Sequence, residues 1–112
     1  MAITKNIFID QGSTYSASLT AQDSYGNTIN INGATGYCHL RRSYYSSSYN
    51  EMTVSVTGAS GSGWYNLYMG ATATAELKPG VYVYDVEFHK PDGTVVRVRQ
   101  GNATVDPEVT KL

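Results

Sequence analysis

The segment 78–101 constrains the fold more than any other stretch, because it predicts one long β-hairpin. Residues 81–89 alternate between apolar and polar side chains, a period of two that places neighbours on opposite faces of a strand. The run 90–93 (KPDG) predicts a turn, since glycine can take the left-handed conformation that closes a hairpin. The alternation resumes at residues 95–100. The pattern therefore predicts two antiparallel strands with one face toward a core.

The polar face of this hairpin predicts cross-strand ion pairs. Asp85 and Glu87 share one face of the first strand, while Arg97 and Arg99 share one face of the second. We expect the two arginines to lie across from the two carboxylates, where each pair stabilises a sheet by roughly 0.2–1 kcal/mol. Gly101 then predicts a bulge or a bend before residues 102–105.

The same alternation recurs along the rest of the chain. It predicts strands at 3–10, 14–21, 29–31, 36–43, 51–57 and 64–69, with a flexible turn at 58–63. Only 71–77 has a helix-compatible composition, and Pro79 limits it to one or two turns. About seven to nine short strands predict an all-β, immunoglobulin-like antiparallel β-sandwich, with a small barrel as the alternative. A chain of 112 residues predicts a single domain over 1–112.

Composition narrows the classes of partner. The net charge of −1 gives no electrostatic case for nucleic acid or an anionic membrane. Cys38 is the only cysteine, so no disulfide forms within one chain. No apolar run is long enough for a signal peptide or a membrane helix, so we expect synthesis and folding in a cytoplasm.

Catalytic and metal-binding patterns are weak in this sequence. Cys38 and His39 are neighbours on a predicted strand, so their side chains point to opposite faces and form no dyad with each other. One cysteine and two separated histidines match no zinc spacing. Asp85 and Glu87 have arginine neighbours, which favours a surface ion-pair ladder over acid–base chemistry. We expect a protein without enzymatic activity, cofactor or metal.

Tyrosine is abundant, with ten in 112 residues. Four tyrosines fall on predicted core positions (Tyr15, Tyr65, Tyr82 and Tyr84), whereas others lie outside the core or in loops. Exposed aromatic side chains among serine, glycine and asparagine are typical of binding surfaces. We assign the interaction role to five residues: Tyr44, Tyr45, Tyr49, Trp64 and Tyr68. They could contact protein, stack on sugar rings as one flat platform, or simply cover the sandwich edges.

Three stretches together carry a family resemblance: IDQGSTYSASLTAQDSYGNTININGATG, then LRRSYYSSS, then LKPGVYVYDVEFHKPDGTVVRVRQGNATVDPEVT. Their order resembles that of small immunoglobulin-like structural proteins of tailed bacteriophage virions, especially cyanophage-type myoviruses. It is also similar in layout to the N-terminal module of phage baseplate upper proteins. The resemblance covers nearly the whole chain, and it supplies no catalytic residues.

The resemblance implies a non-enzymatic structural protein of the virion. Its partners would be other virion proteins, in the tail, neck or baseplate, and a homo-oligomer is expected because open sheet edges need covering. A capsid decoration protein and a carbohydrate-binding module remain the two alternatives.

Overall fold

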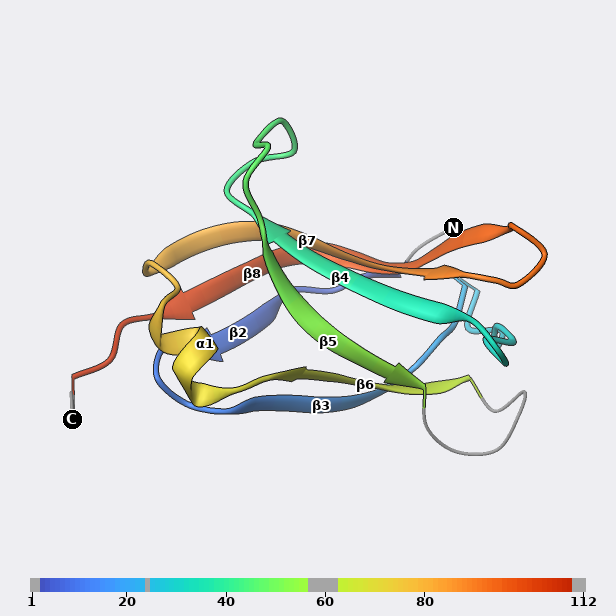
Figure 1. Ribbon diagram of the computed structural model, residues 1–112, viewed down its shortest axis with the longest axis horizontal. Coiled ribbons are helices and arrows are strands. Elements are labelled where there is room, and N and C mark those ends of the chain that lie inside the picture. The colour runs from blue at the N-terminus through green and yellow to red at the C-terminus, as the bar shows by residue number, and fades with distance from the viewer. Residues whose placement is uncertain (1–2, 24, 57–62, 110–112) are drawn as a thin grey trace.

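The alternating segments form β-strands in a computed structural model that describes residues 3–23, 25–56 and 63–109. Figure 1 shows these elements along the chain. The strands are β1 (Ile3–Thr4), β2 (Ile7–Asp10), β3 (Tyr15–Thr20), β4 (Thr35–Arg41), β5 (Asn50–Val56), β6 (Trp64–Met69), β7 (Gly80–His89) and β8 (Val95–Asp106). One short helix, α1 (Ala71–Ala75), follows β6. The fold is therefore all-β, as the sequence predicts.

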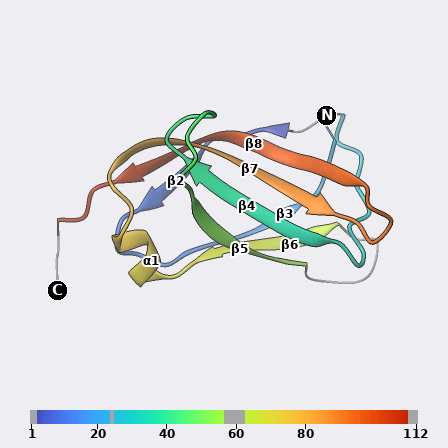
Figure 2. The same ribbon diagram turned by 45° about the horizontal axis from the view of Figure 1, so that its top comes forward.

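Two sheets share one strand. The strand order is β1-β8-β7-β4-β5-β6-β3, with β2 also paired to β8. The first half of β5 pairs with β4 and its second half, from Thr53 to Val56, pairs with β6. Figure 2 shows β4, β7 and β8 together in one layer and β3 and β6 in the other. We call the first layer the charged sheet and the layer of β3, β6 and the second half of β5 the neutral sheet, after their outer faces.

The pairing supports an immunoglobulin-type sandwich. The orders β3–β6–β5 and β4–β7–β8 correspond to the B–E–D and C–F–G orders of that fold. Tyr82, near the start of β7, donates its hydroxyl to the carbonyl of Lys78 at 2.7 Å. This bond is the tyrosine corner of such sandwiches, in which a tyrosine near the start of strand F bonds the backbone a few residues upstream. Arg42 stacks on the Tyr82 ring at 4.3 Å and also donates to the carbonyl of Pro79.

The core lies between the two layers. It is filled by inward-facing side chains of both sheets, including Tyr65 and Leu67 from β6 and Val86 and Phe88 from β7. Tyr65 and Phe88 pack edge to face with ring centroids 5.2 Å apart. Tyr65, Tyr82 and Tyr84 are buried as the alternation predicts, whereas Tyr15 is half-buried at the margin of the core.

The N-terminal strand differs from its prediction in two ways. The segment 3–10 is interrupted at Lys5 and Asn6, so β1 and β2 are separate, and both run parallel to β8. The sandwich is therefore not purely antiparallel. Gly101 lies opposite the interruption, where a Cβ atom would overlap the carbonyl oxygen of Lys5. The Asn6 side chain accepts a hydrogen bond from the Asn102 amide at 3.1 Å, which closes the gap in the ladder.

A β-bulge changes the position predicted for Arg99. Val86 pairs with Arg99 while Glu87 pairs with Arg97, so Val98 is the extra residue of β8. Both Val98 and Arg99 then face the interior. Arg99 donates from Nε to the Tyr84 hydroxyl at 3.1 Å instead of meeting a carboxylate. The predicted ladder is thus wrong for Arg99 and confirmed for Arg97, whose Nε lies 3.3 Å from Asp85.

Two loop predictions have different outcomes. The segment 29–31 is not a strand, although Ile31 is fully buried and a single bridge joins Gln22 to Thr28 just before it. The turn predicted at 58–63 lies outside the described residues except for Gly63. The short helix is confirmed, and its buried Thr74 donates to the Ser13 carbonyl and accepts from the Gly12 amide.

Candidate functional site

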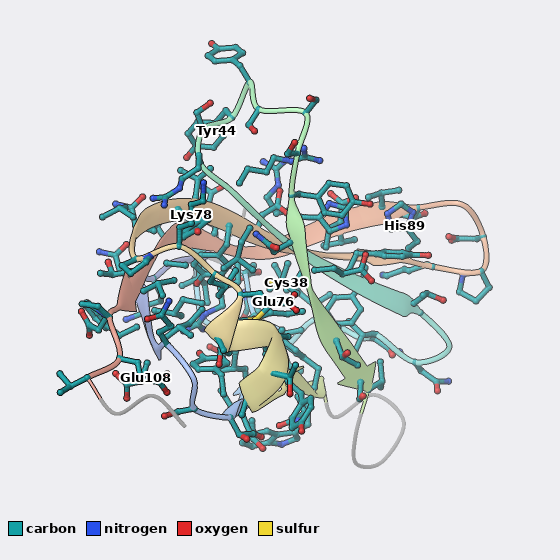
Figure 3. The ribbon with its side chains drawn as sticks, turned by 60° about the vertical axis from the view of Figure 1, so that its left-hand side comes forward. Cys38, Tyr44, Glu76, Lys78, His89 and Glu108 are labelled. Atoms are coloured by element: carbon teal, nitrogen blue, oxygen red, sulfur yellow. The ribbon has the colours of Figure 1, made fainter. Side chains whose placement is uncertain are left out.

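The loop between β4 and β5 projects away from the sandwich in Figure 1. Tyr44 and Tyr45 occupy it and are 78% and 98% exposed. Figure 3 shows Tyr44 on this loop, well away from the buried Cys38. Both side chains present flat aromatic surface on a short segment that otherwise contains only serine between 43 and 48. The structure thus places these two predicted interaction residues at an exposed tip.

The base of this loop is held by hydrogen bonds and ring stacking. Arg41 donates to the Ser46 carbonyl at 2.7 Å, across the loop. Tyr49 stacks on His39 with centroids 3.9 Å apart and nearly parallel planes, and the Arg41 guanidinium lies 4.8 Å from the Tyr49 ring centroid. Tyr49, the third predicted contact residue of this loop, therefore anchors the loop and is only about half exposed.

Trp64 and Tyr68 lie on a different surface. Both project from β6, and their partners in the ladder are Thr20 and Ser16 of β3. They face solvent from the neutral sheet, whereas the β4–β5 loop rises from the opposite side of the molecule in Figure 1. The five predicted residues therefore form two separate surfaces, and no single flat sugar platform joins them.

The outer face of the charged sheet contains an open groove of about 530 Å³. Its walls come from outward-facing positions of three adjacent strands and the tip loop: Tyr37, His39 and Arg41 from β4, Asp85 and Glu87 from β7, Arg97 from β8, and Tyr44. Sequence reasoning identified the Asp85–Arg97 pair but missed this groove. The missing information was that β4 pairs with β7, which brings His39 beside Asp85.

The ionisable groups of the groove partly neutralise one another. Burial raises the pKa of the Asp85 carboxyl above its ordinary value, and the nearby Arg97 guanidinium opposes this shift. His89 lies 2.9 Å from Glu87, and His39 lies 3.4 Å from Glu51. The face thus offers both signs of charge beside two aromatic rings, which suits a polar partner rather than an apolar one.

Chemistry elsewhere in the described residues is limited. Burial raises the pKa of the Cys38 thiol to about 12, so the thiol is protonated and unreactive at neutral pH. No group of three histidine, cysteine, aspartate or glutamate side chains suited to a metal ion occurs within 3–23, 25–56 and 63–109. Over the same ranges, no helix has the length and apolar character needed to cross a membrane.

Comparison with known proteins gives a structural likeness without a sequence family. No family model matches the chain, and no curated protein matches it. Among solved structures, the N-terminal domain of phage TP901-1 ORF48 superposes with a TM-score of 0.57 at 17% identity. That alignment covers 91% of this chain and 85% of the phage domain. The Listeria monocytogenes internalin-like protein lmo2027 aligns over 94% of this chain and 28% of its own length, with a TM-score of 0.47 and 20% identity.

The first of these likenesses is informative about the fold. It covers most of both chains, so the overall β-sandwich fold is shared with a domain of a phage protein. The second falls below the similarity at which two folds can be equated. The shared fold locates no active site.

Proposed function

We propose that this protein is a non-enzymatic structural component of a phage virion, in the tail, neck or baseplate. The observation that carries the proposal is the fold likeness over almost the full length of a phage domain. The sequence resemblance to cyanophage-type virion proteins and to the N-terminal module of baseplate upper proteins supports the same setting. Its partners would be other virion proteins rather than nucleic acid or membrane, consistent with a net charge of −1.

The tip of the β4–β5 loop is the contact surface that we assign to this role. Tyr44 and Tyr45 supply contact area with few rotatable bonds, and the bonds of Arg41 and the Tyr49 stack hold the base of the loop. A loop that is already ordered loses less entropy when a partner binds. Aromatic anchors of this kind carry much of the binding energy in protein interfaces.

The contact role is tested by removing the exposed rings. We expect Tyr44→Ser combined with Tyr45→Ser to leave the melting temperature unchanged and to lower incorporation into phage particles several-fold. Tyr49 is left intact because it anchors the loop. Tyr25→Ser is the matched control, since Tyr25 is also a highly exposed loop tyrosine. Equal incorporation of the double variant and the control would reject this loop as the contact surface.

The virion setting is tested by counting copies in purified particles with quantitative mass spectrometry. A small number that matches tail symmetry supports a tail, neck or baseplate component. A number that matches the capsid lattice would replace this assignment by capsid decoration. Absence from the particle would overturn the virion role altogether.

Carbohydrate binding is the second candidate, and the groove on the charged sheet is the observation that favours it. Carboxylates such as Asp85 and Glu87 accept hydrogen bonds from sugar hydroxyls, and Tyr37 offers a ring against which a sugar could pack. The single tryptophan, Trp64, lies on the neutral sheet, so its fluorescence would not report this groove. Chemical shifts of the Asp85 and Glu87 amides, titrated with a glycan panel, test the idea; unchanged shifts would eliminate it.

A further inference from the structure

The neutral sheet ends in a strand with a bare edge. β3 stands at one end of the strand order, and within the described residues its backbone pairs with β6 alone. The strand is six residues long and has no charged residue, proline or bulge. Proteins usually protect an edge of this kind with one of those devices, because a row of unpaired N–H and C=O groups invites another strand.

The inward side of β3 is incompletely covered. Tyr15, Ala17 and Leu19 face the core, yet all three are only half-buried. Their partners on the neighbouring strand, Met69, Leu67 and Tyr65, are buried. The sandwich is therefore open along β3, and apolar surface would be removed from water if a further strand continued the sheet there.

The sequence of β3 is complementary to itself when it is read in the antiparallel direction. The run 14–20 (TYSASLT) is symmetric in chemical type about Ala17. In an antiparallel pair centred on Ala17, Ser16 faces Ser18 of the second copy, so hydroxyls meet on the outer face. Tyr15 faces Leu19 of the second copy on the inner face. Hydroxyl pairs and aromatic–aliphatic pairs are among the favourable cross-strand neighbours of a sheet.

We propose that two copies of this chain pair through β3 about a two-fold axis at Ala17, which joins two three-stranded neutral sheets into one six-stranded sheet. A two-fold interface requires one surface patch to complement itself, and the symmetric run 14–20 meets that requirement. The proposal does not depend on the phage role, because it follows from the edge alone. A pairing of two six-residue strands is small, so we expect micromolar to millimolar affinity in dilute solution and fuller pairing in an assembly.

Sedimentation of the purified chain over a range of concentrations tests the pairing. We expect the wild type to form dimers reversibly. Ser16→Lys combined with Ser18→Lys places two introduced lysines opposite one another at both outer pairs. The dimer dissociation constant should then rise about tenfold or more, which corresponds to about 1.4 kcal/mol. Both serines are exposed, so circular dichroism and the melting temperature should show an unchanged fold.

A charge reversal tests the register. In Ser16→Lys combined with Ser18→Glu, each introduced lysine faces an introduced glutamate of the second copy, so dimerisation should return to the wild-type level or exceed it. Thr53→Lys combined with Ser55→Lys is the matched control, since it adds the same charge to the same outer face on β5. We expect it to leave the dissociation constant within about twofold of wild type.

Three results would overturn the proposal. The first is a wild type that stays monomeric at every concentration. The second is a double-lysine variant that dimerises as well as wild type. The third is a lysine–glutamate variant that is as weak as the double-lysine variant, which would exclude the register centred on Ala17. None of these results bears on whether the chain is found in phage particles, so the two proposals fail independently.

Discussion

The two outer faces of the sandwich differ in charge. The charged sheet and the adjoining first half of β5 present many ionisable side chains outward, among them His39, Arg41, Glu51, Asp85, Glu87, His89 and Arg97. The neutral sheet presents serine, threonine, asparagine and two aromatic residues, and none of its described outward positions on β3, on β6 or on the second half of β5 is charged. The first face suits a partner that reads charge, and the second suits close packing or backbone pairing, which salt hardly affects.

The two ends of the strand order differ in how regular their edge strands are. At the charged end, β1 and β2 cover most of β8, and the ladder is irregular at Lys5 and Asn6. At the neutral end, β3 is regular and uncovered. The contrast indicates that the edge formed by β1 and β2, which we call the closed edge, is too short and interrupted to be a good template for another chain. The edge formed by β3 is regular enough to pair with another chain. The predictions below test this contrast from the largest expected effect to the smallest.

Replacing Gly101 should break the closed edge. In Gly101→Ala the added methyl group meets the Lys5 carbonyl oxygen, and the positive φ of 153° disfavours an L side chain. The clash and the strain together should lower the free energy of unfolding by about 3 kcal/mol. Urea denaturation measures this loss. The control is Gly93→Ala, which also has a positive φ but has open space around it, and should cost about 1 kcal/mol.

If both glycine variants lost the same stability, backbone conformation alone would explain the effect. The approach of Lys5 to Gly101 would then not be what closes this edge.

The Tyr84 hydroxyl should contribute next most to the closed edge. It donates to the Lys5 carbonyl at 2.6 Å and accepts from Arg99, so Tyr84→Phe leaves a half-buried guanidinium without its acceptor. We expect a loss of about 2 kcal/mol in urea denaturation. Tyr82→Phe removes only the hydrogen bond to the Lys78 carbonyl, and this carbonyl keeps a long contact to Arg42. This variant should therefore lower the free energy of unfolding by only about 1 kcal/mol. Equal losses would show that the Arg99 contact adds nothing to stability.

Much of the fold was predictable because its signals are local. Alternation identifies β3, β6 and β7 within one or two residues of their observed bounds. It also identifies the start of β8, but this strand continues through Gly101 to Asp106, six residues beyond the predicted end. The lack of alternation at 44–49 likewise predicts the exposed tip, where Tyr44 and Tyr45 are found. The hydrogen bond from Tyr82 to Lys78 was not predicted, because it is evident only once Tyr82 is placed near the start of β7.

The remaining features depend on contacts that are distant in sequence. The alternation of residues 95–99 gives no sign of the bulge that turns Arg99 inward, since a bulge depends on how β7 pairs with β8. Ile31 is apolar because tertiary packing buries it, although it belongs to no strand. In the sequence, such an apolar residue cannot be told from an inward-facing residue of a strand. Predicting the groove would have required the register between β4 and β7. Predicting that Trp64 lies far from the tip loop would have required the order of the strands in the two sheets.

The smallest expected effect is a pH dependence confined to the charged sheet. Burial, together with the neighbouring Glu87, raises the pKa of Asp85, and Arg97, His39 and Arg41 oppose the rise. A raised carboxyl pKa means that the folded state binds the proton more tightly than the unfolded chain. The stability that this group supplies is therefore present at low pH and is lost as the pH rises through the folded pKa. Wild type should lose stability relative to Asp85→Asn between about pH 3 and pH 7.

Asp92 at the hairpin turn provides a matched control of opposite sign. Its side chain accepts from the Thr94 amide at 2.9 Å, which lowers the pKa of the Asp92 carboxyl. The stability that this group supplies is present above the unfolded pKa and is lost as the pH falls. The free energy of unfolding of wild type should therefore rise relative to that of Asp92→Asn as the pH rises. Urea midpoints across the same pH range measure both differences. Parallel slopes for the two variants would show that burial does not control the Asp85 titration, and the charged face would then behave as an ordinary solvated surface.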